Sequence, residues 1–197
     1  MITLSRQSVS GGILLLILLV YLGSGFYTVA PEEQAVVLRF GQVVRETGPG
    51  LHYHLPKPIE DYFRLRTGAE YPMSVGYKLM DEAQGLPPDE RGMQWLTGDT
   101  NLINIQLYIR YRIVNAKDFL FATEEPHFLV RRAAESALTE WVGHSQVDEL
   151  LTFGKSEAAS QLRQVTQSRL DEYRAGIAIV AGEVKALEPP EAVRFEF

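Results

Sequence analysis

The stretch "NLINIQLYIRYRIV", residues 101–114, decides the fold class of this chain. Apolar and polar residues alternate along it, and the apolar positions are Ile103, Ile105, Leu107, Ile109, Tyr111 and Ile113. Successive side chains of a β-strand point to opposite faces, so this spacing places all six on one face. The stretch therefore predicts a long strand with one apolar and one polar face.

The neighbouring segments supply strand partners. Gly98-Asp99 is a turn signal, and residues 93–96 can form the other arm of a hairpin with the long strand. Further on, "IAIVAGEVKAL", residues 177–187, predicts a last strand that ends before Pro189-Pro190. We expect the long strand and the last strand to share one sheet.

Two helices are predicted between these strands. The first follows Pro126, which suits a first helical turn, and its apolar face is Val130, Ala134, Ala137, Leu138 and Trp141. The second runs from about Lys155 to Tyr173, and its apolar stripe is Ala158, Leu162, Val165 and Tyr173, with Leu170 on the flank and Gly176 as the C-terminal cap. Between them, Ser145 and Asp148 resemble a capping box. We expect the helices to cover the sheet, with Trp141 in the core, in an α+β fold.

The segment before the long strand predicts an antiparallel β unit. Short runs rich in β-branched and aromatic residues, at 34–40, 41–50, 51–55 and 59–67, are separated by Gly and Pro. We assign residues 31–80 to this unit. Residues 81–95, which contain Pro87-Pro88 and many charges, predict an exposed loop.

The first thirty residues predict a membrane anchor. No charged residue lies between Arg6 and Glu32, and a membrane-spanning helix needs about 20 apolar residues. We assign residues 1–10 to a short cytoplasmic N-terminus and residues 11–30 to the transmembrane helix. Its anchor residues are Ile13, Leu14, Leu15, Leu16, Ile17, Leu18, Leu19, Val20, Tyr21 and Leu22. A cleaved signal peptide, cut near Gly23-Ser24-Gly25, is the alternative.

Composition excludes several classes of function. The chain has 197 residues, a net charge of −6 and no cysteine, so we expect neither a nucleic-acid-binding face nor a cysteine nucleophile. Nucleotide-binding, hydrolase and metalloprotease motifs are also absent from the sequence. Glu32-Glu33 and Asp148-Glu149 could act as acid and base, but they are better explained by a loop and a helix start. We therefore predict no catalysis and no cofactor.

His52 and His54 raise the question of a metal site. On a strand, residues two apart face the same way, so both rings could reach one zinc ion. Zinc needs three or four ligands, and only His127 and His144 remain as further histidines. The alternative is a short structural strand over residues 51–55, and this is the interpretation we favour.

The segment "YTVAPEEQAVVLRFGQVVRETGPGLHYHLPKPIE", residues 27–60, resembles the start of an SPFH (band 7, stomatin/prohibitin/flotillin) domain. Pro31, Glu33, Val36, Phe40-Gly41, Gly48-Pro49-Gly50 and Pro56 carry the match. "LTGDTNLINIQLYIRYRI" (96–113), "RRAAESALTEWVG" (131–143) and Pro189-Pro190 continue it, in the pattern of the HflK-like branch of the family.

The resemblance implies a fold and a place in the cell. It implies a membrane-proximal β subdomain over residues 31–80 and an α+β subdomain over 96–190. It also implies a single-pass protein of the bacterial inner membrane with its domain on the periplasmic side. His52, Tyr53 and His54 are then expected to lie near the lipid surface, without a metal.

The resemblance also implies partners. These are an HflC-like sister subunit, an FtsH-like membrane protease that the assembly modulates, and membrane lipids. A lipid-organising stomatin-like scaffold without a protease is the alternative. Subunit contacts are expected around Arg131 and Arg163, with Glu135, Glu140 and Glu157 as partners. Residues 191–197 are expected to begin a C-terminal helix that is truncated or absent, in a fragment or a naturally short relative.

Overall fold

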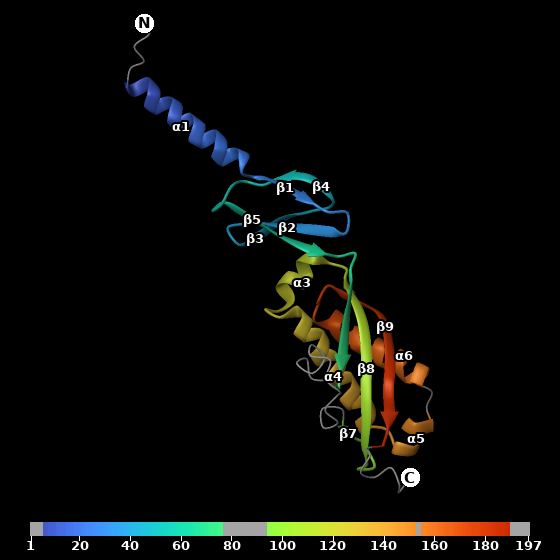
Figure 1. Ribbon diagram of the computed structural model, residues 1–197. Coiled ribbons are helices and arrows are strands. Elements are labelled where there is room, and N and C mark those ends of the chain that lie inside the picture. The colour runs from blue at the N-terminus through green and yellow to red at the C-terminus, as the bar shows by residue number, and fades with distance from the viewer. Residues whose placement is uncertain (1–5, 77–93, 153–154, 190–197) are drawn as a thin grey trace. The chain divides into compact units, whose positions relative to one another are not determined.

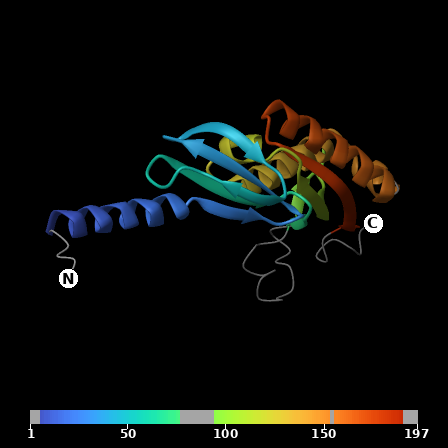
Figure 2. The ribbon, with the colours of Figure 1, turned by 90° about the horizontal axis from the view of Figure 1, so that it is seen from above.

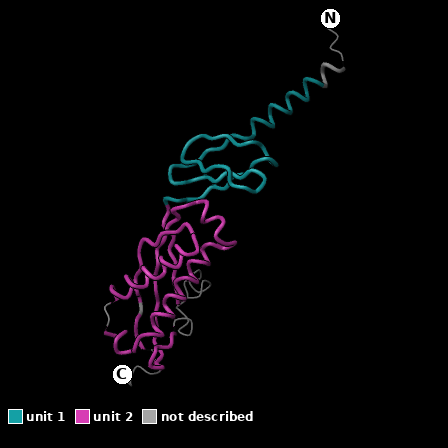
Figure 3. The backbone as a smooth tube through the Cα atoms, turned by 180° about the vertical axis from the view of Figure 1, so that it is seen from behind, with its two compact units in different colours: residues 1–68 teal, residues 69–197 magenta. Residues whose placement is uncertain are grey.

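The computed structural model describes residues 6–76, 94–152 and 155–189, which fall into two compact units (Figure 3). Unit 1 comprises residues 1–68 and unit 2 comprises residues 69–197. The predicted segment 191–197 and most of the predicted loop 81–95 lie outside the described residues. The two units are described in turn.

Unit 1 contains one helix and two small antiparallel sheets (Figure 1). The helix α1 (Arg6–Gly23) is followed by β1 (Phe26–Val29), which pairs with β4 (Gly50–Tyr53) in a two-stranded ribbon. The second sheet has the order β3-β2-β5 and consists of β3 (Gln42–Thr47), β2 (Glu33–Arg39) and β5 (Glu60–Arg66). The predicted antiparallel β unit is confirmed.

The expected helix over residues 11–30 is longer than the helix observed. After Gly23 the chain turns, and residues 26–29 form β1. Gly25 explains the turn, because a Cβ at this position would lie 2.1 Å from the carbonyl oxygen of His54. The Gly25 carbonyl in turn accepts a hydrogen bond from the His54 amide at 2.9 Å. The backbone at Gly25, just before β1, and the chain after β4 therefore approach more closely than a side chain would allow.

Unit 2 is built on β8 (Leu102–Ile113), which is the strand predicted from residues 101–114. The six apolar residues of that prediction are at most 2% exposed. β8 pairs antiparallel with β6 (Glu70–Val75), β7 (Gln94–Leu96) and β9 (Ile177–Glu188). The predicted hairpin arm and the predicted last strand are thus both confirmed.

The unit boundary differs from the expectation. The residues of β6 fall within the range expected for the membrane-proximal subdomain, residues 31–80, but β6 pairs with β8 over the register Glu70↔Arg112 to Val75↔Leu107. The boundary therefore falls between Gly68 and Ala69. Gln94 and Trp95 likewise belong to β7 instead of the predicted loop.

The helices α3 (Ala116–Ala122), α4 (Pro126–Gly143), α5 (Val147–Thr152) and α6 (Lys155–Glu172) cover the apolar face of the β8 sheet (Figure 1). Pro126 is in the first turn of α4, as predicted. Trp141 is only partly buried, and its neighbour Val142 occupies the core instead. Figures 1 and 2 show α6 lying alongside β9.

The buried stripe of α6 is rotated from the predicted one. Val165 and Tyr173 are exposed, whereas Thr166 and Leu170 are buried. The inward face is therefore Ala158, Leu162, Thr166 and Leu170, at a spacing of four. The Thr166 hydroxyl donates to the Leu162 carbonyl at 2.6 Å, so its polar group is satisfied within the helix.

Two predicted helix caps are replaced by other residues. Ser145 donates its hydroxyl to the Trp141 carbonyl, and the first amide of α5, at Val147, bonds instead to the carboxylate of Asp99 at 3.2 Å. At the end of α6, Arg174 adopts the left-handed conformation at φ 50, and the Ala175 amide reaches back to the Leu170 carbonyl. Gly176 has a different role, because a Cβ there would meet the Asn115 carbonyl at 2.4 Å.

Most charges expected at subunit contacts are engaged within unit 2. Arg131 is 7% exposed, Glu135 pairs with Arg132, and Glu140 pairs with Arg169. The expectation of subunit contacts around Arg131 and Arg163 stays a prediction. Arg163 remains exposed on α6.

Candidate functional site

The outer face of the β1–β4 ribbon carries large apolar side chains. Phe26 stands opposite Tyr53, and Thr28 stands opposite Leu51. Phe26 is 62% exposed, Leu51 68% and Tyr53 38%, and the Phe26 and Tyr53 rings meet edge to face at 5.1 Å. Alternation along each strand forces these residues to the same side, away from the core of unit 1. The ribbon thus presents a small aromatic and aliphatic surface.

The inner face of the same ribbon carries both histidines. The Tyr27 ring lies between them, with its centroid 5.7 Å from the His52 ring and 5.5 Å from the His54 ring. Tyr62 of β5 stacks on Tyr27 at 4.3 Å and lies 5.1 Å from His54. The two histidines do face the same way, as their spacing predicts, but they face an aromatic cluster.

Each histidine ring also donates a hydrogen bond to a backbone carbonyl. His52 Nε2 bonds to the Gly48 oxygen at 2.8 Å, and His54 Nδ1 bonds to the Leu55 oxygen at 2.7 Å. These bonds fix the turn before β4 and the chain that follows it. Within the described ranges, no group of three or more His, Asp and Glu side chains is arranged to hold a metal ion.

The three residues predicted near the lipid surface, His52, Tyr53 and His54, therefore differ in their exposure. Tyr53 is on the exposed face, His52 is partly buried, and His54 is only 6% exposed. The His54 ring packs inside unit 1, and the expectation that the three residues lie near the lipid surface stays a prediction. Sequence reasoning missed Leu51, although strict alternation around His52 could have identified it.

A buried carboxylate ties together the strands behind the ribbon. The side chain of Glu60 is 1% exposed and accepts hydrogen bonds from Arg39 at 2.8 Å, Arg45 at 3.1 Å and the Leu55 amide at 2.8 Å. Burial alone raises the pKa of Glu60, but the Leu55 amide, Arg39 and Arg45 outweigh it and hold the pKa below its usual value. The ionised carboxylate therefore connects β2, β3 and β5 to the segment that follows β4.

Sequence reasoning also missed this charge cluster. Arg39 and Glu60 are directly opposite in the β2–β5 register, so a predicted strand pairing was the available signal. The Arg45 guanidinium adds a hydrogen bond to the Tyr53 carbonyl at 2.8 Å. The cluster thus positions the aromatic ribbon.

The predicted anchor residues Ile13–Leu22 all lie on α1, and their side chains are between 39% and 68% exposed. At the C-terminal end of the helix, the Tyr21 hydroxyl donates to the Lys57 carbonyl at 3.0 Å. Among the helices of the described residues, none is both long enough and apolar enough to cross a membrane.

Asp148 and Glu149, which were considered for catalysis, lie in the first turn of α5, as expected for a helix start. They also line a pocket of about 690 Å³ together with Trp141 and Glu157, which the sequence analysis did not anticipate. Glu149 accepts a weak hydrogen bond from the Gln146 amide at 3.4 Å, which is a capping contact of α5. Glu32 is adjacent to Gly68 in unit 1.

Comparison with protein families identifies the fold. The model of the SPFH domain / Band 7 family matches residues 27–195, which is most of the chain. The chain belongs to the SPFH domain / Band 7 family. This confirms the family predicted from residues 27–60 and 96–113, and its domain contains both the β unit and the α+β unit described above.

Among curated SPFH proteins, several named HflK are similar to this chain. "Protein HflK" of Vibrio parahaemolyticus is 28% identical over 187 residues, covering 95% of this chain and 42% of the relative. "Modulator of FtsH protease HflK" of Escherichia coli K12 is 28% identical over 181 residues, covering 92% and 39%. "Protein HflK" of Borreliella burgdorferi is 24% identical, covering 93% and 59%. The chain thus spans about two fifths of the first two relatives.

Proposed function

We propose that this chain is an HflK-like membrane scaffold that modulates an FtsH-like membrane protease. The observation that carries the proposal is its similarity, over 92% of its length, to a protein named as a modulator of FtsH protease. The scaffold has no catalytic role of its own and acts by binding. An HflC-like sister subunit is the proposed partner in the assembly.

α1 is the proposed single-pass anchor. Ten consecutive apolar or aromatic residues, Ile13–Leu22, leave much of their side-chain surface uncovered, and burying such surface in lipid is favourable. The charges that flank the apolar run are Arg6, at the start of α1, and Glu32, after its end, so positive charge favours a cytoplasmic N-terminus. Both SPFH units then lie on the periplasmic side of a bacterial inner membrane.

The outer face of the β1–β4 ribbon is the proposed membrane-proximal surface. Phe26 and Tyr53 are aromatic residues of the kind that favour the membrane–water interface, and β1 begins three residues after α1 ends. Leu51 adds aliphatic surface beside them. In this proposal His52 and His54 support the ribbon from within unit 1.

Reconstitution tests the proposed function. An FtsH-like protease is placed in proteoliposomes with or without this chain and the sister subunit, and degradation is followed for one membrane-embedded and one soluble substrate. A scaffold that limits access slows degradation of the membrane substrate and leaves the soluble substrate unchanged. A lipid-organising scaffold without a protease partner changes neither rate, and that result contradicts the proposal.

A further inference from the structure

The outer edge of β9 is an open strand edge bordered by α6. Among the residues that the structure describes, β9 pairs with β8 on one side and with no strand on the other. An unpaired edge presents backbone amides and carbonyls that another strand can bind. The side chains and backbone groups along this edge show which part of it is available.

The register determines which backbone groups point outward. Ile177, Ile179, Gly182 and Val184 are opposite Ile113, Tyr111, Ile109 and Leu107, which are every second residue of β8. β9 has one extra residue at Val180 and one at Lys185, and each of these two bulges shifts its register with β8 by one residue. In an antiparallel pair, the backbone amide and carbonyl of alternate residues point toward the partner strand, and those of the residues between them point away from it. These four residues of β9 therefore all direct their backbone groups to the same side.

The side chain of Gln167 shows that the backbone groups of these residues point outward, away from β8. Its amide nitrogen donates to the Ile177 carbonyl at 3.0 Å, and its amide oxygen accepts from the Ile179 amide at 2.7 Å. Gln167 thus takes the place of a neighbouring strand at the start of β9. At the other end, Lys155 Nζ donates to the Lys185 carbonyl at 3.3 Å.

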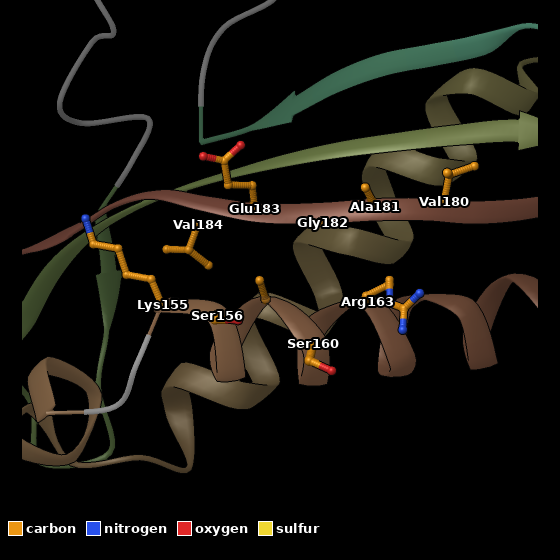
Figure 4. Close-up of a pocket in the computed structure, with 10 residues that line it drawn as sticks. Lys155, Ser156, Ser160, Arg163, Val180, Ala181, Gly182, Glu183 and Val184 are labelled. Carbon is orange, nitrogen blue, oxygen red and sulfur yellow. The ribbon is translucent and has the colours of Figure 1, made fainter.

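Between these two ends, Gly182 and Val184 leave a window. No side chain of residues 94–152 or 155–189 bonds to their outward backbone groups. A cavity of about 500 Å³ lies beside the window, between α6 and β9 (Figure 4). A second cavity of about 540 Å³ shares Ser160 and Arg163 with it, so a groove continues along the α6–β9 seam.

The groove has a positive charge at the window. Arg163 is exposed and makes no ion pair or hydrogen bond with the described residues, and Lys155 bonds only to a carbonyl. Glu183 is paired with Lys185 at 3.0 Å, and Figure 4 shows its carboxylate pointing away from α6. Small side chains, Ser156, Ala159 and Ser160, keep the α6 wall low beside Gly182.

We propose that this window binds an extended acidic peptide segment of a partner protein by β-strand addition. The peptide backbone pairs with Gly182 and Val184, and its carboxylates meet Arg163 and Lys155. Six residues, from Val180 to Lys185, span about 17 Å of extended chain, which suits a segment of about five residues. Backbone pairing supplies affinity, and the cations select acidic side chains.

The probe is a dye-labelled heptapeptide of alternating threonine and glutamate, and binding to the full chain in mild detergent is measured by fluorescence anisotropy. Saturable binding is expected, and the same peptide with lysine in place of glutamate should not bind. Arg163→Glu should raise the Kd about five- to tenfold. The matched control Lys117→Glu reverses an exposed charge on α3, and its Kd should stay within about twofold of wild type.

Methylated peptides test the strand pairing itself. A strand pairs through one of its two edges, so N-methylation of one alternate set of amides should weaken binding about tenfold or more, while methylation of the other set should leave it unchanged. Equal binding of both methylated peptides, equal Kd values for the two charge variants, or no saturation would each refute the proposal. If no peptide binds and Arg163→Glu instead dissociates oligomers of the chain, a second copy occupies the groove and the proposal is wrong.

Discussion

The Tyr111 hydroxyl is hydrogen-bonded to Nδ1 of His127, so the central strand β8 is connected directly to the first turn of α4. Phe119 of α3 and Tyr71 of β6 also pack against the His127 ring, at 5.3 Å and 5.5 Å. Burial lowers the pKa of His127, and burial together with the nearby Tyr71 raises the pKa of Tyr111 to about 12. The pair is therefore neutral at physiological pH.

This pair predicts an acid-sensitive unit 2. In the unfolded chain His127 takes up a proton below a pKa of about 6.5, whereas in the folded chain it does so only at lower pH. The free energy of unfolding therefore falls as the pH drops from about 6.5 toward the lowered pKa of the folded state. The measurement is thermal unfolding at pH 7.5 and 5.5, followed by the fluorescence of Trp95 and Trp141, which are both in unit 2. His127→Asn should remove most of the pH dependence, whereas His144→Asn, an exposed control, should keep it.

The Glu60 cluster predicts a loss of stability in unit 1. Glu60→Gln leaves two guanidinium groups without their carboxylate and weakens the bond to Leu55, at a cost of about 2–3 kcal/mol. Hydrogen exchange of residues 54–66 measures the free energy of opening. Glu46→Gln makes the same chemical change at an exposed position and should cost less than about 0.5 kcal/mol. Equal protection in the two variants would show that the cluster does not hold the strands together.

The close contacts of Gly25 predict that replacing it with alanine destabilises unit 1, whereas the same replacement at Gly23 does not. Gly25→Ala forces a methyl group against the His54 carbonyl and the Tyr53 ring, and overpacking of this kind costs about 1–3 kcal/mol. Gly23→Ala, two residues earlier, meets no atom within 4 Å and should be neutral. Exchange rates in β1 and β4 compare the two variants. Similar rates in both would mean that the close backbone approach is not required.

The proposed membrane-proximal surface of the ribbon predicts that a probe at Leu51 is in contact with lipid. The chain has no natural cysteine, so Leu51→Cys can carry a single environment-sensitive fluorophore in reconstituted vesicles. We expect blue-shifted emission that spin-labelled lipid quenches. Gln42→Cys, at an exposed site on β3, is the control and should show solvent-like emission. Solvent-like emission from both sites would remove the ribbon from the proposed membrane surface.

Periodicity predicted the parts of the fold in which local pattern and burial agree. The alternation from Ile103 to Ile113 matches the buried residues, and so does the apolar spacing of α4 from Val130 to Leu138, whereas Trp141 is only partly buried. The predicted stripe of α6 is right at Ala158 and Leu162 and wrong at Val165 and Tyr173. Thr166 is buried in their place, although it counts as polar in sequence, because its hydroxyl donates to the Leu162 carbonyl. Asp99, 48 residues from the α5 amide that it caps, has no local signal at all.

The candidate site was only partly predictable for a similar reason. The spacing of His52 and His54 correctly placed them on one face, but spacing cannot say which face of a ribbon is buried. That depends on Tyr62, which comes from another strand. The Glu60 cluster likewise depends on the pairing of β2, β3 and β5, which brings together Arg39, Arg45 and Glu60.

The measurement that tests the central proposal most directly is crosslinking of the tagged chain in native bacterial membranes, followed by purification and identification of the attached proteins. The membrane fraction is first checked for the tagged chain, so that failure to insert is not mistaken for failure to bind. The account predicts recovery of an FtsH-like protease together with an HflC-like subunit. Efficient crosslinking of membrane-inserted chain that yields lipid or unrelated proteins, and no such protease, would contradict it.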